Sequence, residues 1–85
     1  MIIEFTRNFK EDFDFWKEKD RKVCERVLQI INSIKESPFV GIGKPEPLKY
    51  EFSGCWSRRI NKEHRIIYRV AGNAVQLLAC RYHYK

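Results

Sequence analysis

The sequence has no long apolar run, few cysteines and no secretion signal, and each absence excludes a class of protein. No run of about 18 apolar residues is present, which excludes a membrane-spanning helix. The three cysteines are an odd number at wide spacings, which argues against a disulfide framework and for a reducing compartment. The first residues lack the basic start and apolar core of a signal peptide. We therefore expect a cytoplasmic protein with no membrane partner.

Motifs for metals and phosphate loops are also missing. The sequence has no C-x-x-C and no H-x-x-x-H, and Cys80 with His83 forms one pair without a companion, whereas a structural zinc site needs about four ligands. Residues 41–44 (GIGK) resemble a phosphate-binding loop, but Pro45 follows the lysine where Ser or Thr is required. We expect no metal and no cofactor.

Acidic residues are scarce in the second half of the chain. Residues 1–42 hold eight basic and eight acidic side chains, and residues 43–85 hold nine basic and three acidic ones, so the whole net charge of +6 lies in the second half. Such an excess favours a polyanionic partner, most often nucleic acid, although a soluble surface that is merely basic gives the same count. The 85 residues predict one domain, residues 1–85, with a thin core that favours a dimer or a protein partner.

Apolar periodicity predicts two helices after a short strand at residues 1–6. Thr6 and Asn8 are both residue types that cap the first helix, and Asp20 caps the second, which ends before Pro38. The apolar stripes of the two helices are Phe9, Phe13 and Trp16, and then Val23, Val27, Ile30, Ile31 and Ile34.

The remaining chain predicts a loop and four strands. Residues 37–48 hold all three prolines and form the loop. Alternation predicts strands at residues 48–52, 56–60, 64–70 and 74–81, with Arg58 and Arg59 on opposite faces of the second of these. The order β-α-α-β-β-β-β predicts an α+β fold in which two N-terminal helices pack on a twisted, mainly antiparallel sheet.

A carboxylate and an arginine are candidates for chemistry. Glu46 lies between Pro45 and Pro47, which restrict its backbone, and neighbouring lysines would keep it ionised. Arg65 follows Glu63 by two residues, so alternation predicts an ion pair that orients the arginine. Whether Arg58 or Arg59 shares a face with Arg65 depends on a hairpin register that the sequence leaves open.

The C-terminal tail adds a histidine and tyrosines. RNA cleavage without a metal requires a base, a cation and an acid. A carboxylate, an arginine and a histidine such as His83 can supply these three roles. Alternation places His83 and Tyr84 on opposite faces, so both reach one site only if the tail bends. Composition alone is equally consistent with a module that only binds RNA or DNA.

Four segments together resemble the YoeB toxins of the RelE/ParE superfamily. They are KPEPLK at residues 44–49, WSRRI at 56–60, EHR at 63–65 and ACRYHY at 79–84. The resemblance covers essentially the whole chain and implies a RelE/ParE-like fold. It also implies an mRNA endonuclease that acts at the A site of the 70S ribosome and blocks translation. The implied partners are a YefM-like antitoxin, a second copy in a homodimer, and operator DNA reached only through the antitoxin complex.

The resemblance also implies roles for individual residues. Glu46 would be the general base, Arg65 the phosphate-stabilising cation, His83 the general acid, and Tyr84 would position the scissile phosphate or base. The implied RNA-binding set is Lys49, Arg59, Glu63 and Arg81, with Glu63 orienting arginine. The implied products are a 2′,3′-cyclic phosphate or 3′-phosphate and a 5′-hydroxyl.

Two departures and two rival functions accompany this resemblance. Cys55 stands where an aromatic residue is expected, and Lys85 extends the usual terminal tyrosine. One rival is a ParE-like toxin that binds DNA gyrase, but such proteins generally lack the Glu/Arg/His set. The other is a toxin-like fold that only binds its antitoxin and operator DNA.

Overall fold

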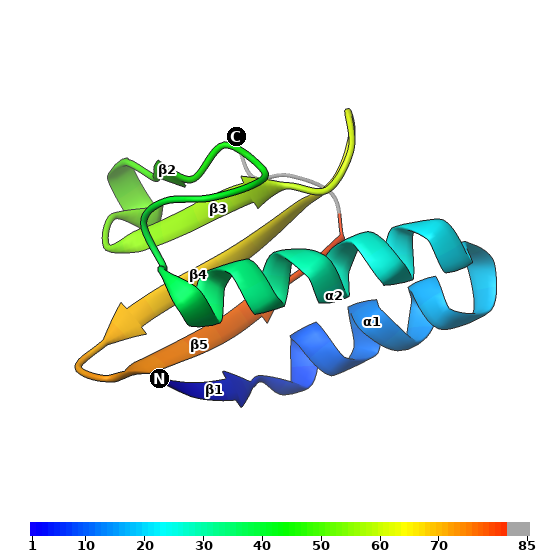
Figure 1. The fold of residues 1–85 in the computed structure, drawn as a ribbon, viewed down its shortest axis with the longest axis horizontal. Coiled ribbons are helices and arrows are strands. Elements are labelled where there is room, and N and C mark those ends of the chain that lie inside the picture. The colour runs from blue at the N-terminus through cyan, green and yellow to red at the C-terminus, as the bar shows by residue number, and fades with distance from the viewer. Residues whose placement is uncertain (82–85) are drawn as a thin grey trace.

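The elements follow the predicted order, β-α-α-β-β-β-β, with one additional helical turn (Figure 1). A computed structural model of the chain describes residues 1–81. The elements are β1 (Ile2–Phe5), α1 (Arg7–Lys19), α2 (Arg21–Glu36), β2 (Glu46–Pro47), the 3₁₀ turn η1 (Tyr50–Phe52), β3 (Cys55–Arg59), β4 (Arg65–Ala71) and β5 (Ala74–Ala79). No helix within residues 1–81 combines the length and the apolar content that crossing a membrane requires.

Side-chain caps set the starts of both helices. The Thr6 hydroxyl accepts a hydrogen bond from Phe9 N at 3.2 Å, so Thr6 rather than Asn8 caps α1. Asp20 caps α2 as predicted, because its carboxylate accepts from the backbone N–H groups of Lys22 and Val23. The helix α2 ends at Glu36, and its C-cap Ser37 directly precedes the proline that cannot continue the helix.

The sheet is mixed, with the strand order β1-β5-β4-β3-β2. The β2–β3, β3–β4 and β4–β5 pairs are antiparallel, as predicted, and β1 adds a parallel edge beside β5. The strand predicted at residues 48–52 is wrong. Pairing with β3 is confined to Glu46 and Pro47, and the chain then enters η1 with Tyr50 at a φ of 59°, which a strand residue does not adopt.

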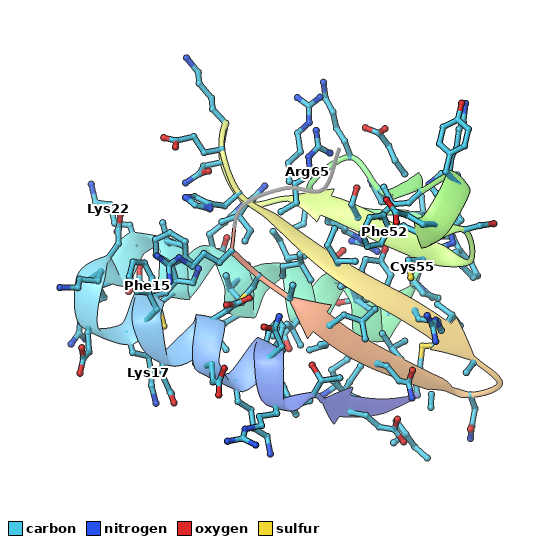
Figure 2. The ribbon with its side chains drawn as sticks, turned by 180° about the vertical axis from the view of Figure 1, so that it is seen from behind. Phe15, Lys17, Lys22, Phe52, Cys55 and Arg65 are labelled. Atoms are coloured by element: carbon cyan, nitrogen blue, oxygen red, sulfur yellow. The ribbon has the colours of Figure 1, made fainter. Side chains whose placement is uncertain are left out.

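Both helices cover one face of the sheet, and the main core lies between them (Figure 1). The predicted stripes supply this core, because Phe9, Val27, Ile30 and Ile34 are at most 1% exposed. Seen from behind, the sheet lies in front of the helices (Figure 2). A smaller apolar cluster of Cys55, Ile67 and Ala79 lies apart from the main core. The predicted arrangement of two helices packed on a sheet is therefore confirmed.

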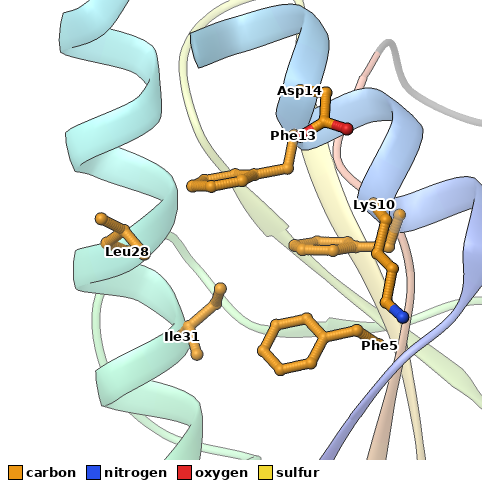
Figure 3. A pocket seen from close by; sticks show the side chains of 7 residues that line it. Phe5, Lys10, Phe13, Asp14, Leu28 and Ile31 are labelled. Carbon is orange, nitrogen blue, oxygen red and sulfur yellow. The ribbon is translucent and has the colours of Figure 1, made fainter.

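One apolar hollow of about 250 Å³ opens beside α1 and α2 (Figure 3). Phe5, Phe9 and Phe13 form a ladder in it, with ring centroids 5.8 and 6.3 Å apart, and α2 contributes Leu28 and Ile31. Its lining is almost entirely apolar, so it offers little to a polyanion.

Candidate functional site

Glu46, Ser57 and Arg65 meet on one face of the sheet. Glu46 lies opposite Ser57 in the β2–β3 register, and Arg59 lies opposite Arg65 in the β3–β4 register. Directly opposite residues share a face, so all four side chains belong to one surface. The Arg65 Nη1 atom lies 3.9 Å from Glu46 Oε1 and donates to Ser57 Oγ at 3.5 Å. The sheet thus brings together a carboxylate and a guanidinium that are far apart in the sequence.

The exposure of this pair suits a site that receives a ligand from solvent. The Glu46 side chain is 53% exposed, whereas the Arg65 side chain is 26% exposed. Arg65 is the more enclosed partner, and the Ser57 hydroxyl, which is fully buried, supports its guanidinium from below. The carboxylate is open to solvent and could exchange a proton with a bound ligand. Figure 2 shows where Arg65 lies in the molecule.

Two guanidinium groups face each other across β3 and β4. Arg59 and Arg65 are directly opposite, which is unfavourable for like charges. The single negative charge of Glu46 does not neutralise the two positive charges. Arg69 follows on the same face, opposite Cys55, and it extends the positive charge along the sheet. This arrangement attracts an anion such as a phosphodiester.

The register settles which arginine of β3 belongs to this surface. Arg59 is exposed on it, whereas Arg58 is fully buried on the helix side. The Arg58 Nε atom donates to Tyr68 Oη at 3.1 Å inside the core. Arg59 is therefore the neighbour of Arg65 at the site, which the sequence left open.

The prediction of an ion pair between Glu63 and Arg65 is wrong, because the ion pairs formed among residues 1–81 do not include it. Glu63 lies in the bend before β4, where strand alternation does not apply, and Asn61 Oδ1 accepts from its backbone N–H at 2.9 Å. Among the described residues, the carboxylate within ion-pair distance of Arg65 is that of Glu46. The side chain of Glu63 instead lines a hollow on the helix side of the molecule.

In that hollow, His64 and Arg81 lie beside aromatic residues of α1. Trp16 and His64 contact each other edge to face with ring centroids 4.6 Å apart, and the Arg81 guanidinium lies 3.5 Å from the centre of the Phe15 ring. Glu63, His64 and Arg81 line it together with residues of α1. Two members of the expected RNA-binding set, Glu63 and Arg81, are thus neighbours here rather than beside Glu46.

Of the remaining expected site residues, the structure describes Lys49 but not His83 and Tyr84. Lys49 is exposed, three residues after Glu46, and directly precedes η1. His83, Tyr84 and the tail bend that was expected to bring them together lie outside the described residues. No cluster of His, Cys, Asp and Glu suited to a metal occurs within residues 1–81.

The helix α1 fixes the segment that leads to the C-terminal tail, and sequence reasoning missed these contacts. Asn8 Nδ2 donates to Leu78 O at 2.9 Å, the carboxylate of Asp12 accepts from Cys80 N at 3.0 Å, and Trp16 Nε1 donates to Cys80 O at 2.8 Å. The strand β1 pairs with β5 only as far as residue 77, so α1 completes the edge beyond that point. The spacing of residues 8, 12 and 16, one turn apart on a single helix face, is the signal that could have revealed this role.

Burial changes the titration of two groups in this segment. Desolvation raises the pKa of Asp12, although the backbone hydrogen bond from Cys80 and the charge of Arg81 oppose the increase. Desolvation, with smaller contributions from Asp12 and Cys24, raises the pKa of the Cys80 thiol. A buried thiol with a raised pKa is unreactive, so Cys80 serves the packing of the core.

Comparison with known proteins identifies relatives over nearly the whole chain. Residues 5–84 match the family described as the YoeB-like toxin of bacterial type II toxin–antitoxin systems. A toxin named YoeB from Mycobacterium bovis is 50% identical over 82 residues, which are 96% of each chain. A toxin named YoeB from Escherichia coli K12 is 45% identical over 84 residues, which are 99% of this chain and all of that one.

Solved structures give the same result. The YoeB/ParE toxin from Agrobacterium tumefaciens superposes with a TM-score of 0.94 at 42% identity, over 99% of this chain and 100% of that one. The YoeB dimer from Staphylococcus aureus gives a TM-score of 0.89 at 38% identity, and a YoeB–YefM complex from the same species gives 0.88 at 36%. Both cover 99% of this chain and 98% of the other.

Proposed function

This chain belongs to the YoeB-like toxins of bacterial type II toxin–antitoxin systems, and we propose that it is an endoribonuclease that cuts mRNA in the ribosomal A site and so stops translation. The observation that supports the proposal is the contact of Arg65 with Glu46 and Ser57 on a face that also carries Arg59. A base and two cations on one accessible surface are what attack on a phosphodiester needs.

In the proposed reaction, the 2′-oxygen of RNA attacks the adjacent phosphorus atom. The Glu46 carboxylate accepts the proton of the 2′-hydroxyl as the O2′–P bond forms. Arg65, assisted by Arg59, stabilises the additional negative charge of the phosphorane. The P–O5′ bond breaks as His83 donates a proton to the leaving oxygen, and Tyr84 positions the scissile phosphate or base. The products are a 2′,3′-cyclic phosphate and a 5′-hydroxyl.

The rest of the basic surface serves to bind RNA. Lys49 and Arg59 contact the backbone near the reacting phosphate, and Arg81 contacts it farther along the chain of the substrate. Binding of this kind weakens steeply with salt, because each phosphate contact releases a counterion. The proposed scheme assigns Glu63 no contact with Arg65, since Glu46 occupies that place.

The relatives indicate the proposed partners. A related toxin from Staphylococcus aureus forms a complex with YefM, and another structure of it is a dimer. We propose a YefM-type antitoxin that inhibits this chain, a homodimer, and contact with operator DNA only through the antitoxin complex. The substrate complex would be the 70S ribosome with mRNA in its A site.

Primer extension on mRNA from translating ribosomes tests the activity. The wild-type chain is expected to give cuts linked to codons, and Glu46→Ala and His83→Ala are expected to remove them. Glu51→Ala is the matched control, because Glu51 is an exposed carboxylate in the neighbouring 3₁₀ turn and has no proposed role. Growth arrest without cuts would refute the proposal and would favour a toxin that acts by binding alone.

A substrate with 2′-deoxyribose at the cleaved position tests the mechanism. Cleavage is expected to stop, because the attacking hydroxyl is missing. Cleavage that persists at the same bond would mean that water is the nucleophile, and it would remove the proposed role of Glu46.

A further inference from the structure

Arg58 has a complete set of hydrogen bonds in the interior, and the proposed reaction does not use it. Its side chain is fully buried. The guanidinium has five N–H donors, and five hydrogen bonds of 2.6–3.2 Å account for them. The acceptors are the hydroxyl groups of Tyr68 and Ser33 and the backbone carbonyls of Ser37, Val40 and Ile42.

None of these acceptors is charged. Among residues 1–81, no carboxylate lies within ion-pair distance of Arg58. Its positive charge is instead compensated by backbone carbonyls, one of which belongs to Ser37 at the C-terminal end of α2, where the helix dipole is negative. An arginine of this kind organises the backbone around it.

The backbone that Arg58 organises is the loop from α2 to β2. Tyr68 adds a second anchor, because its hydroxyl donates to Pro38 O at 2.6 Å while it accepts from Arg58. Desolvation raises the pKa of Tyr68, which keeps the hydroxyl protonated and able to donate. Arg58 and Tyr68 thus hold four loop or helix-end carbonyls, those of residues 37, 38, 40 and 42.

The two glycines of the GIGK segment let the loop approach this closely. A Cβ atom at Gly41 would overlap the Ser33 hydroxyl and lie 2.9 Å from the Arg58 Nη1 atom. A Cβ atom at Gly43 would lie 3.0 Å from Arg59 O and 3.2 Å from the Cβ atom of Arg58. Both glycines also have positive φ angles, of 134° and 84°. The GIGK segment, which resembles a phosphate-binding loop, therefore packs closely against the buried guanidinium of Arg58.

The anchored loop leads directly to Glu46. Gly43 O accepts from Arg59 N at 2.6 Å, three residues before Glu46, and Leu48 N donates to Cys55 O at 2.9 Å, two residues after it. Between these points Glu46 pairs with Ser57 of β3, but the pairing covers only two residues, and Pro45 and Pro47 have no N–H to donate to it. The position of Glu46 thus depends on how firmly the loop before it is fixed.

We propose that Arg58 and Tyr68 form a clamp that positions Glu46 against Arg65 and the scissile phosphate. They are positioning residues, since neither lies on the face that carries the reacting groups. The inference rests on the proposed function and names the part of the fold that sets the geometry of its general base.

Single-turnover cleavage on programmed ribosomes tests the clamp. Tyr68→Phe removes the hydroxyl shared by Arg58 and Pro38 and keeps the ring. We expect the cleavage rate constant to fall on the order of 10- to 100-fold, as for a displacement of about 1 Å, with the half-saturating toxin concentration unchanged. Tyr50→Phe is the matched control, because Tyr50 is 91% exposed and its hydroxyl has no role in the clamp.

The decisive measurement repeats Tyr68→Phe in a Glu46→Gln background. If the clamp acts through Glu46, the second substitution adds no further loss, because there is no base left to misplace. A loss of the same factor in both backgrounds would overturn the proposal and indicate a general structural role. Wild-type rates for Tyr68→Phe would overturn it as well.

A second variant replaces Tyr68→Phe if that variant does not fold, and the rate of Glu46→Gln distinguishes failure of the clamp from failure of the proposed function. If Tyr68→Phe does not fold, Ser33→Ala decides, because it removes only the 2.6 Å bond to Arg58 Nη1, and Ser53→Ala in the exposed turn is its control. Failure of the proposed function has a different signature. In that case Glu46→Gln by itself leaves the rate unchanged, whereas failure of the clamp leaves Glu46→Gln with only a residual rate and Tyr68→Phe at the wild-type rate.

Discussion

Arg58 and Arg59 are adjacent in β3, and replacing each with methionine should have opposite consequences. Arg58 is fully buried and donates five hydrogen bonds, whereas Arg59 is exposed on the face of Glu46 and Arg65. Arg58→Met is expected to destabilise the fold strongly. Arg59→Met is expected to leave stability unchanged or slightly higher, because it relieves the repulsion from Arg65, and to weaken RNA binding.

The magnitude for Arg58 follows from the acceptors that it leaves behind. A hydrogen bond to a charged group contributes about 1.5–3 kcal/mol to stability. The sum over the five bonds of Arg58 is an upper limit on the loss of stability in Arg58→Met, and the actual loss is smaller. Removing the guanidinium also removes the cost of burying its charge, and the loop carbonyls can turn to water. We expect a loss of about 3–4 kcal/mol, against a total free energy of unfolding of roughly 4–13 kcal/mol for 85 residues.

Urea unfolding followed by tryptophan fluorescence measures the difference, because Trp16 is buried in the main core and Trp56 packs against it. A loss of about 3 kcal/mol lowers Tm by about 12–24 °C in a domain of this size, while Arg59→Met should stay within about 0.5 kcal/mol of the wild type. Equal midpoints for the two variants would refute the reasoning, since the faces assigned to residues 58 and 59 would then have no energetic consequence.

Three further predictions concern the site and the end of β5. Arg65→Lys is expected to lose most cleavage activity on programmed ribosomes, because an ammonium group cannot replace the planar guanidinium at a phosphate, and near-normal rates would reduce Arg65 to steering. Asp12 has a raised pKa in the folded state, so the native state holds its proton to higher pH than the unfolded state, and its contribution to stability falls as pH rises from its ordinary pKa through the raised one. Urea midpoints measured across that range should show this decline relative to Asp12→Asn, and a contribution that rises with pH would contradict it. A thiol reagent should label Cys24, which is partly exposed, well before Cys55 and Cys80, and equal labelling rates would contradict their burial.

Some features of the site followed from the sequence because they depend on local rules. Alternation along β3 predicted opposite faces for Arg58 and Arg59, and the structure confirms this. The prolines around Glu46 predicted a restricted backbone, and this residue lies in the short strand β2. A local pattern failed where the chain leaves regular structure, as it does at Glu63 in the bend before β4.

The strand predicted at residues 48–52 failed for a related reason. The segment has strand-like composition, but alternation cannot reveal a backbone reversal. Within the segment, Tyr50 adopts a φ angle of 59°, which residues other than glycine rarely adopt and which alternation of side chains does not predict.

The sequence by itself determined the two amphipathic helices, the last three strands and the concentration of positive charge in the second half, because periodicity and composition are local properties. Only the tertiary structure decided that Glu46 meets Arg65 and that Arg58 lies inside while Arg59 lies outside beside it. Those relations depend on strand register, which long-range pairing fixes and no short window of sequence contains. The same pairing places the GIGK segment around a buried guanidinium, and a motif that looks like a phosphate loop is thereby given a structural role.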